Sequence, residues 1–287
     1  MKTITANNLI CPIDGEKLSL NEKQFICENG HSFDLARQGY VNLLPVQHKR
    51  SKHPGDSKEM VVARTAFLNS GVYEKIAKKL AEISLSHMNA DSGACIMDAG
   101  CGEGYYFDYL YHFLQNNDGE NEISFIGLDI SKYAIIDSAK RNKNITWVVG
   151  TNRQPPVRDH SVDIILCVFG FHSFEGFNKI LKSQGKLILV EAGADHLKEL
   201  RDIIYADVKK TDPPDLSIAQ EIGFSLIDSQ ELKFETGNIH NQDLNQLLLM
   251  TPHFFRASKE GREIAMGLPE LNLTVDVVFR VLEKEMS

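Results

Sequence analysis

The sequence lacks the long apolar runs and the paired cysteines that would indicate a membrane protein or a disulfide-stapled fold. No hydrophobic run approaches the roughly 20 residues that a helix needs to span a bilayer. The first residues, Met-Lys-Thr-Ile, do not begin a signal peptide. The 5 cysteines are an odd number at dispersed positions, which argues against a disulfide framework. We therefore expect a cytoplasmic protein with no membrane segment.

The sequence also lacks internal repeats, low-complexity segments and an excess of basic residues. Its 287 residues are 43% hydrophobic and 24% charged, which is the composition of an ordinary soluble globule. The length allows a domain of about 200 residues and a smaller one. The net charge of −8 argues against loose, charge-driven binding to nucleic acid. This sum covers the whole chain, however, and a local basic surface is compatible with it.

A glycine-rich turn after an apolar strand is the most informative feature. The strand is predicted over residues 94–98 and ends in Asp98, and residues 105–114 have the pattern of a helix. The turn between them contains Gly100, Gly102 and Gly104. Glycine lets the backbone approach a ligand closely at a helix N-terminus. The turn therefore predicts a nucleotide-type cofactor at the carboxyl edge of a parallel sheet.

Three polar residues narrow the choice of cofactor. A second strand, 123–128, ends in Asp129, whose carboxylate is well placed to accept hydrogen bonds from two ribose hydroxyls. Glu103, inside the turn, would repel a pyrophosphate but favour the cationic amino and sulfonium groups of S-adenosylmethionine. Asn152, just past a third strand at 145–150, is a candidate for binding the adenine. The D-x-G-x-G-x-G pattern resembles the first motif of S-adenosylmethionine-dependent methyltransferases, and residues 128–131 resemble their second motif.

The rest of the chain alternates strands with helices. Further strands are expected at 162–168 and 186–191, and helices at 60–69, 72–83, 131–141 and 195–209. This alternation predicts an α/β fold with a doubly wound, Rossmann-like parallel sheet. Strand-like segments at 231–235 and 275–282 flank a helix at 241–250 and predict an antiparallel pair at one edge of the sheet.

Residues 1–45 are predicted to form a separate, zinc-ribbon-like module. A knuckle-like turn at 11–15 precedes a short predicted strand at 18–19, and a second turn at 27–31 follows a short predicted strand at 25–26. A module this small needs a staple, and a metal is the usual one in a reducing compartment. The candidate ligands are Cys11, Asp14, Cys27 and His31. Closed zinc sites favour sulfur and nitrogen over a carboxylate, so two alternatives stay open: bound zinc, or a site without metal held by packing on the large domain through Phe33, Tyr40 and Leu43.

Residues 46–90 are predicted to be a basic linker and two helices that lead into a methyltransferase domain at 91–287. Between positions 37 and 64 the sequence has more cationic than acidic residues. The acidic ones are Asp56 and Glu59, and the cationic ones are Arg37, Lys49, Arg50, Lys52, Lys58 and Arg64. An exposed charged loop and a strip that contacts RNA phosphates are alternative interpretations. The candidate RNA-binding residues are Lys49, Arg50 and Lys52.

Long and unusual stretches of the chain match one known family. They include residues 38–50, 54–57, 98–106, 196–200 and 249–252, and they extend over nearly the whole sequence. In these stretches the chain resembles the RlmA-type 23S ribosomal RNA (guanine-N1)-methyltransferases. The resemblance implies an enzyme that uses S-adenosylmethionine to methylate N1 of one guanine, with an N-terminal zinc-binding module that helps to hold an RNA hairpin. It also implies cofactor contacts from Tyr73, Glu103, Gly104 and His196.

The chain departs from the family pattern at two places. Asp14 stands where the family has a cysteine ligand. Residues 167–172 replace a serine-x-phenylalanine-alanine-proline segment that is expected to border the target base. The identity of the methylated nucleotide is therefore the least secure inference from the resemblance.

The chemistry requires a group that accepts the proton of guanine N1. His172 and Glu175, near the carboxyl ends of predicted strands, are the candidates, and Phe169 or Phe171 could stack on the base. A solvent-facing loop position is the alternative for His172, while Asp163 lies at the opposite sheet edge and is expected to be structural.

Two other functions remain open at this stage. The acidic total charge favours a small-molecule methyltransferase of the same fold. The altered metal ligands favour a cofactor- and RNA-binding relative without catalysis. Whether the chain forms a homodimer is also open.

Overall fold

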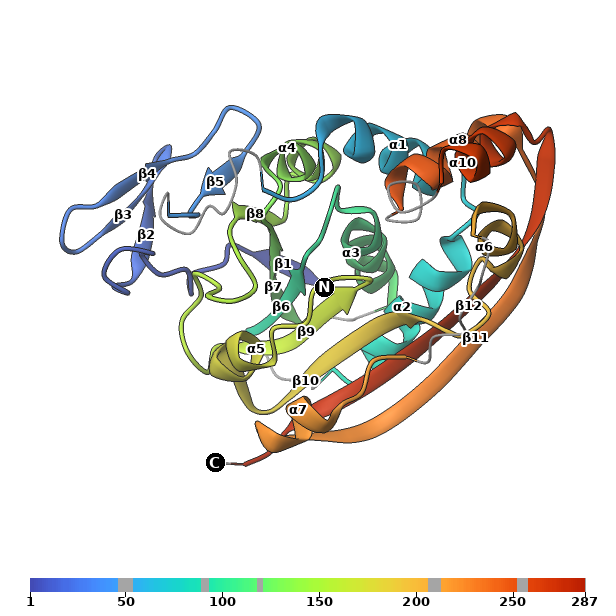
Figure 1. Cartoon of the computed structure of the whole chain (residues 1–287). Coiled ribbons are helices and arrows are strands. Elements are labelled where there is room, and N and C mark those ends of the chain that lie inside the picture. The colour runs from blue at the N-terminus through green and yellow to red at the C-terminus, as the bar shows by residue number, and fades with distance from the viewer. Residues whose placement is uncertain (46–53, 89–92, 118–120, 206–212, 252–257, 287) are drawn as a thin grey trace.

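In the part of the chain that the structure describes, nine strands form one central sheet (Figure 1). The computed structural model describes residues 1–45, 54–88, 93–117, 121–205, 213–251 and 258–286. Across the sheet the strands are β11 (Phe224–His240), β12 (Glu270–Lys284), β10 (Leu181–Ala192), β9 (Val162–Val168), β6 (Ala94–Ala99), β7 (Glu122–Asp129), β8 (Thr146–Val149) and β5 (Tyr40–Asn42). The ninth strand, β1 (Lys2–Ile4), pairs with β7.

Strand directions confirm the predicted doubly wound sheet. From β10 to β5 all neighbouring strands are parallel, whereas β12 is antiparallel to both β10 and β11. The predicted antiparallel pair at one edge is thus also confirmed, although it is longer than expected. Parallel strands covered on both faces require continuous apolar runs, and all six residues of β6 are buried.

Successive residues of β6 point into two separate cores. Ala94 and Ile96 belong to the core under most of the helices, and Cys95 and Met97 belong to the core on the opposite face. The first face is covered by α1 (Lys58–Asn69), α2 (Glu74–Ser86), α3 (Tyr105–Asn117), α4 (Lys132–Arg141), α6 (Lys198–Ile204), α8 (Asn241–Met250) and α10 (Lys259–Gly267). The second face is covered by α5 (Phe174–Ile180), α7 (Ser217–Glu221) and part of the N-terminal segment.

The N-terminal segment is divided between two sheets. The strands β2 (Leu18–Asn21), β3 (Gln24–Cys27) and β4 (Ser32–Asp34) form a small antiparallel sheet that projects from one side of the molecule (Figure 1). The predicted module 1–45 is not separate at its two ends, because β1 and β5 pair with strands of the large sheet. Of the three residues considered for packing on the large domain, Leu43 is buried and Phe33 packs on the core of the second face, whereas Tyr40 is buried in the core of the first face.

The helices also differ in part from the sequence prediction. The helix expected over 195–209 begins only at Lys198, because Leu197 has a left-handed φ of 53° and its N–H donates to the Thr274 carbonyl at 2.7 Å. The short helices α5, α7 and α10 were not predicted. The candidate RNA-binding residues Lys49, Arg50 and Lys52 lie outside the described residues.

Candidate functional site

A cavity of about 830 Å³ lies at the carboxyl ends of the central parallel strands. This is the position at which open α/β sheets bind ligands. Its lining includes all but one of the predicted cofactor residues, namely Tyr73, Asp98, Gly100, Gly102, Glu103, Asp129, Asn152 and His196. The sequence signals therefore converge on one space.

Asp129 and the glycine turn hold one another in place. One carboxylate oxygen accepts the Gly102 N–H at 2.9 Å, and the other accepts the Ser131 N–H at 2.7 Å. Gly100 and Gly102 have φ values of 90° and 56°, which residues with a Cβ rarely adopt. Each carboxylate oxygen has a second lone pair, so Asp129 can still accept hydrogen bonds from ribose hydroxyls.

Gly104 is the predicted cofactor residue that belongs to the packing of the domain instead. It directly precedes α3, and a Cβ at this position would come within 2.9 Å of the Trp147 ring. The third glycine of the motif therefore allows the helix to lie close to the sheet.

Asp98 presents a buried carboxylate to the cavity. It is 1% exposed, and its Oδ1 has no hydrogen-bond partner among the described residues. Burial, together with the charges of Asp129 and Glu103, raises the pKa of Asp98 to about 8. A buried carboxylate without a partner favours a cationic ligand. The residues present therefore fit the cationic part of S-adenosylmethionine.

Glu103 contributes less to this electrostatic preference than its sequence position suggests. Its Oε2 lies 2.7 Å from Arg141 Nη2, and the side chain is 1% exposed. Burial raises the pKa of Glu103, while the Arg141 guanidinium opposes this shift. Because Arg141 already balances the charge of Glu103, the carboxyl of Asp98, whose pKa is about 8, is the group that a cationic ligand would ionise.

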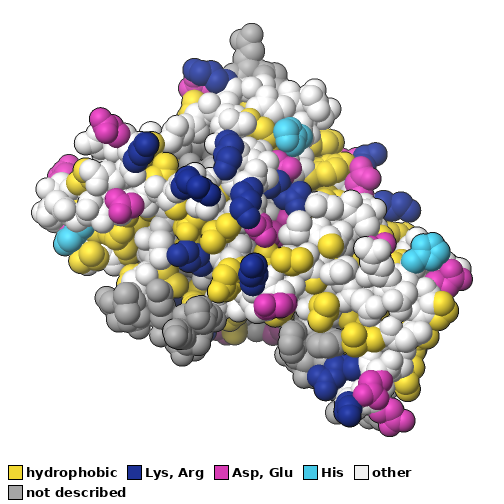
Figure 2. Space-filling model, turned by 90° about the horizontal axis from the view of Figure 1, so that it is seen from above, with side chains coloured by type: hydrophobic (Ala, Val, Ile, Leu, Met, Phe, Trp, Pro, Cys, Tyr) yellow, Lys and Arg dark blue, Asp and Glu magenta, His cyan; other side chains and the backbone are white. Residues whose placement is uncertain are grey.

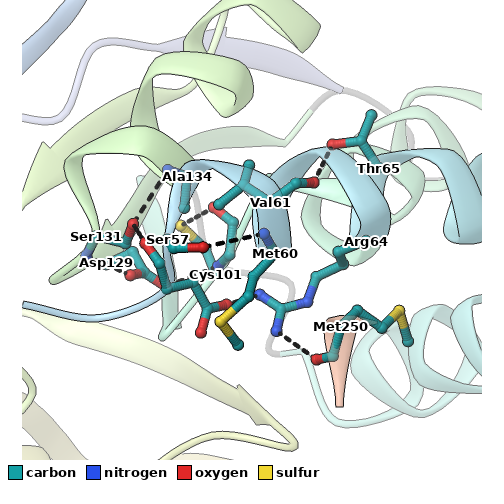
Figure 3. Close-up of polar contacts among 12 residues, drawn as sticks. Ser57, Met60, Val61, Arg64, Thr65, Cys101, Asp129, Ser131, Ala134 and Met250 are labelled. Atoms are coloured by element: carbon teal, nitrogen blue, oxygen red, sulfur yellow. Dashed lines mark hydrogen bonds and ion pairs between the residues drawn. The ribbon is translucent and has the colours of Figure 1, made fainter. Parts of the chain in front are cut away.

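Arg64, on α1, lines the cavity, and Figure 3 shows its side chain directed towards Met250. Its guanidinium forms an ion pair with Asp56 and donates to the Met250 carbonyl at 3.3 Å. The Asp56 carbonyl in turn accepts the Ser131 hydroxyl at 2.8 Å. Arg64 thus links three segments that are distant in sequence, and the sequence pattern gave no signal for this role beyond its charge.

Tyr73 and His196 meet on the wall formed by α2 and the segment before α6. The Tyr73 hydroxyl lies 3.4 Å from His196 Nε2, and His196 Nδ1 accepts the Asp276 N–H at 3.3 Å. The ring of Phe169 lies 5.8 Å from the His196 ring. Asn152 donates to the Phe171 carbonyl at 3.1 Å, so it braces the loop after β9.

The loop after β9 also lines the cavity, beside His196, and exposes two aromatic rings. Phe169 and Phe171 are 43% and 58% exposed, and Phe169 has a left-handed φ of 50°. Such a backbone conformation is costly for an aromatic residue and often marks a functional loop. The flat rings are suited to stacking on a base.

His172 lines the cavity and is not a solvent-facing loop histidine. Its side chain is 14% exposed, and its Nε2 lies 3.6 Å from Glu191 Oε1. Burial, assisted by the charge of Arg280, lowers the pKa of His172. Glu175, the other candidate base, is exposed on α5, whereas Glu191 reaches the cavity. The sequence prediction missed Glu191, although it ends a predicted strand as Asp98 and Asp129 do.

Asp163 has the structural role that was expected. Its Oδ2 accepts the Cys95 N–H at 2.8 Å, and Lys182 pairs with the same carboxylate at 2.8 Å.

A second cluster of side chains lies in the N-terminal small sheet and its adjoining turns. The candidate ligand atoms of Cys11, Asp14, Cys27 and His31 all lie within 4.8 Å of one another. His31 Nδ1 is 3.6 Å from Cys11 Sγ, 3.4 Å from Cys27 Sγ and 2.9 Å from Asp14 Oδ2. Two sulfurs, one nitrogen and one oxygen at such separations fit a four-coordinate zinc ion.

Basic side chains gather on the face seen in Figure 2, between the small N-terminal sheet and the C-terminal helices. The helices on this side of Figure 1 include α1 and α4, which carry the exposed residues Lys58, Lys132 and Lys140. A chain with a net charge of −8 therefore has a local basic surface. Among the described residues, no helix is long and apolar enough to cross a membrane.

Comparison with known proteins agrees with both the cofactor cavity and the group of candidate zinc ligands. Residues 9–52 match the zinc-ribbon family described as RlmA, N-terminal, and residues 97–189 match a methyltransferase domain. A 23S rRNA (guanine(748)-N(1))-methyltransferase of Streptomyces fradiae is 28% identical over 288 residues, which cover 98% of each protein.

Two further relatives carry provisional names as 23S rRNA (guanine-N(1)-)-methyltransferases. The one from Bacillus subtilis is 28% identical over 280 residues, which cover 96% of this chain and 97% of the relative. The one from Micromonospora griseorubida is 31% identical over 212 residues, which cover 68% of this chain and 69% of the relative. With the cofactor cavity and the ribbon both present, the chain belongs to the family of the 23S rRNA (guanine-N1)-methyltransferases.

Proposed function

We propose that this protein transfers a methyl group from S-adenosylmethionine to N1 of a guanine in 23S ribosomal RNA. The observation that carries the proposal is the construction of the cavity. Its lining combines the carboxylates of Asp98 and Asp129 with the exposed rings of Phe169 and Phe171. The carboxylates suit a cationic nucleoside, and the rings suit a flat base.

Each part of S-adenosylmethionine has candidate partners in the cavity. Asp129 would accept the ribose hydroxyls, and the backbone at Gly100 and Gly102 would lie against the methionine part. Asp98 would face the positive charge. When bound, S-adenosylmethionine supplies an electrophilic methyl group; the protein's task is to orient it towards the base and to exclude water.

The N-terminal ribbon is assigned to RNA. Cys11, Asp14, Cys27 and His31 would hold zinc, which would fix the turns of the small sheet. The ribbon and the basic residues Lys49, Arg50 and Lys52 would hold a hairpin of the RNA through its phosphates. A ribosomal RNA substrate would favour a cytoplasmic location. The relatives match across the ribbon as well as the catalytic domain, which favours an RNA substrate over a small molecule.

A methylation assay tests the activity. Purified protein would be incubated with 23S ribosomal RNA and S-adenosylmethionine that carries a labelled methyl group, and the RNA would then be digested to nucleosides. We expect the label in 1-methylguanosine. Label in another nucleoside, or no transfer to RNA, would contradict the proposal.

A further inference from the structure

Glu191 is a buried carboxylate at the end of β10 that the cofactor does not account for. It lines the cavity, and its side chain is 5% exposed. β9 separates its strand from β6, which carries Asp98. Glu191 therefore lies on the side of the cavity formed by the aromatic loop, away from Asp129 on β7.

Arg280 holds one oxygen of this carboxylate and leaves the other free. Arg280 Nε donates to Glu191 Oε2 at 2.6 Å, and Arg280 Nη1 donates to the Pro214 carbonyl at 2.8 Å. Arg280 sits diagonally across from Glu191, because Glu191 pairs with Val278 on the neighbouring strand. Glu191 Oε1, in contrast, has no hydrogen-bond partner in the part of the chain that the structure describes. A buried acceptor without a partner is costly unless a ligand supplies a donor.

The Watson–Crick edge of guanine supplies suitable donors, namely N1–H and the adjacent amino group. A carboxylate oxygen fixed at the bottom of a cavity can accept from N1–H while the ring stacks on an exposed aromatic side chain. His172 Nε2 is 3.6 Å from Oε1, which is beyond a normal hydrogen bond but brings a second polar group to the same place.

We propose that Glu191 is the catalytic base that accepts the N1 proton of the target guanine, and that Arg280 positions it. This inference rests on the proposed function. As the bond from N1 to the methyl carbon forms, the bond from that carbon to sulfur breaks and its electron pair remains on sulfur. The N1 proton passes to Glu191 Oε1, and the electron pair of the N–H bond stays on the ring. The guanine thus gains a methyl group and the carboxylate gains a proton.

The environment of Glu191 suits a base. Burial raises its pKa, although the Arg280 guanidinium opposes the shift, and a carboxylate with a raised pKa accepts a proton more readily. The titratable and charged groups around it are Arg280 on β12, His172 on the loop and Cys167 on β9, whose pKa burial raises.

The test is the pH profile of single-turnover methyl transfer to 23S ribosomal RNA. The Glu191→Gln variant can still accept a hydrogen bond from Arg280 but cannot take a proton. Its rate at pH 7 should fall about 100-fold, with cofactor affinity unchanged. The remaining rate should rise about tenfold per pH unit in the alkaline range, because in this variant guanine N1 must lose its proton to solvent. The parent protein should lose activity only as the pH falls through the pKa of Glu191.

The matched control is Glu231→Gln, which removes an exposed carboxylate of β11 outside the cavity lining and should keep the parent profile. If Glu191→Gln is too unstable, the double variant Glu191→Gln/Arg280→Gln removes both buried charges and should show the same alkaline rise. An unchanged rate, or a reduced rate with the parent pH profile, would overturn the proposal. If the parent protein makes no 1-methylguanosine, the proposed function fails instead, so the two failures are distinguishable.

Discussion

Asp129 fixes the cofactor turn through two backbone hydrogen bonds and would bind the ribose with the lone pairs that remain. Asp129→Ala removes a charged acceptor whose hydrogen bonds contribute about 1.5–3 kcal/mol each. We therefore expect the affinity for S-adenosylmethionine, measured by calorimetry, to fall at least tenfold. Asp137→Ala on α4, which removes a half-buried carboxylate paired with Lys140, is the control. Unchanged affinity in the Asp129 variant would refute the assignment.

Asp98 should favour cofactor binding but lower the free energy of unfolding of the protein without cofactor. An aspartate in the unfolded chain has a pKa near 3.8, and in the fold the pKa is about 8. Between these values the folded protein binds more protons than the unfolded chain. The free energy of unfolding should therefore fall with rising pH, by up to about 1.4 kcal/mol per pH unit.

Asp98→Asn cannot ionise. Without cofactor, this variant should be more stable than the parent protein, with a difference that grows from about pH 5 to pH 8. Its affinity for S-adenosylmethionine should fall about tenfold. Urea unfolding at several pH values and calorimetry measure the two effects. A difference in stability that does not change with pH would show that Asp98 is already ionised in the fold.

At the scale of elements, local sequence predicts what local forces determine. The apolar strands β6, β7 and β9 and the glycine turn could be identified because their runs and end residues carry the signal themselves. The three-residue strands β1 and β5 could not, because their place in the large sheet depends on pairing with β7 and β8, far along the chain. For the same reason, Arg64 and Arg280 gain their roles only from contacts with distant segments.

The ribbon offers a test at the element scale, because Asp14 is its unusual ligand. Thiolate suits zinc better than carboxylate in a closed site, so Asp14→Cys should tighten zinc binding. Elemental analysis and chelator competition would measure this. Asp34→Cys, which adds a thiol at an exposed position of the same small sheet, should leave zinc affinity unchanged. Protein without zinc, with no gain in the Asp14 variant, would mean that packing alone holds the ribbon.

At the scale of the whole molecule, we expect the N-terminal ribbon and the basic residues after it to bind RNA, and the cavity of the large domain to bind the cofactor. Changing Lys49, Arg50 and Lys52 to Glu should weaken RNA binding and flatten its salt dependence by about one unit per lost phosphate contact. Cofactor affinity should stay the same. The control changes Lys78, Lys179 and Lys259 to Glu. These exposed lysines lie on α2, α5 and α10, outside the candidate RNA-binding residues, and their replacement changes the net charge by the same amount. Equal loss of RNA and cofactor affinity would contradict the division.

The central claim is that this protein methylates N1 of one guanine in 23S ribosomal RNA through the cavity at Asp98 and Asp129. Mass mapping of 23S ribosomal RNA from cells with and without the protein tests it most directly. We predict one guanine-containing fragment that loses a methyl group when the protein is absent and regains it with the parent chain, but not with Asp129→Ala. Identical fragment masses with and without the protein would contradict the account.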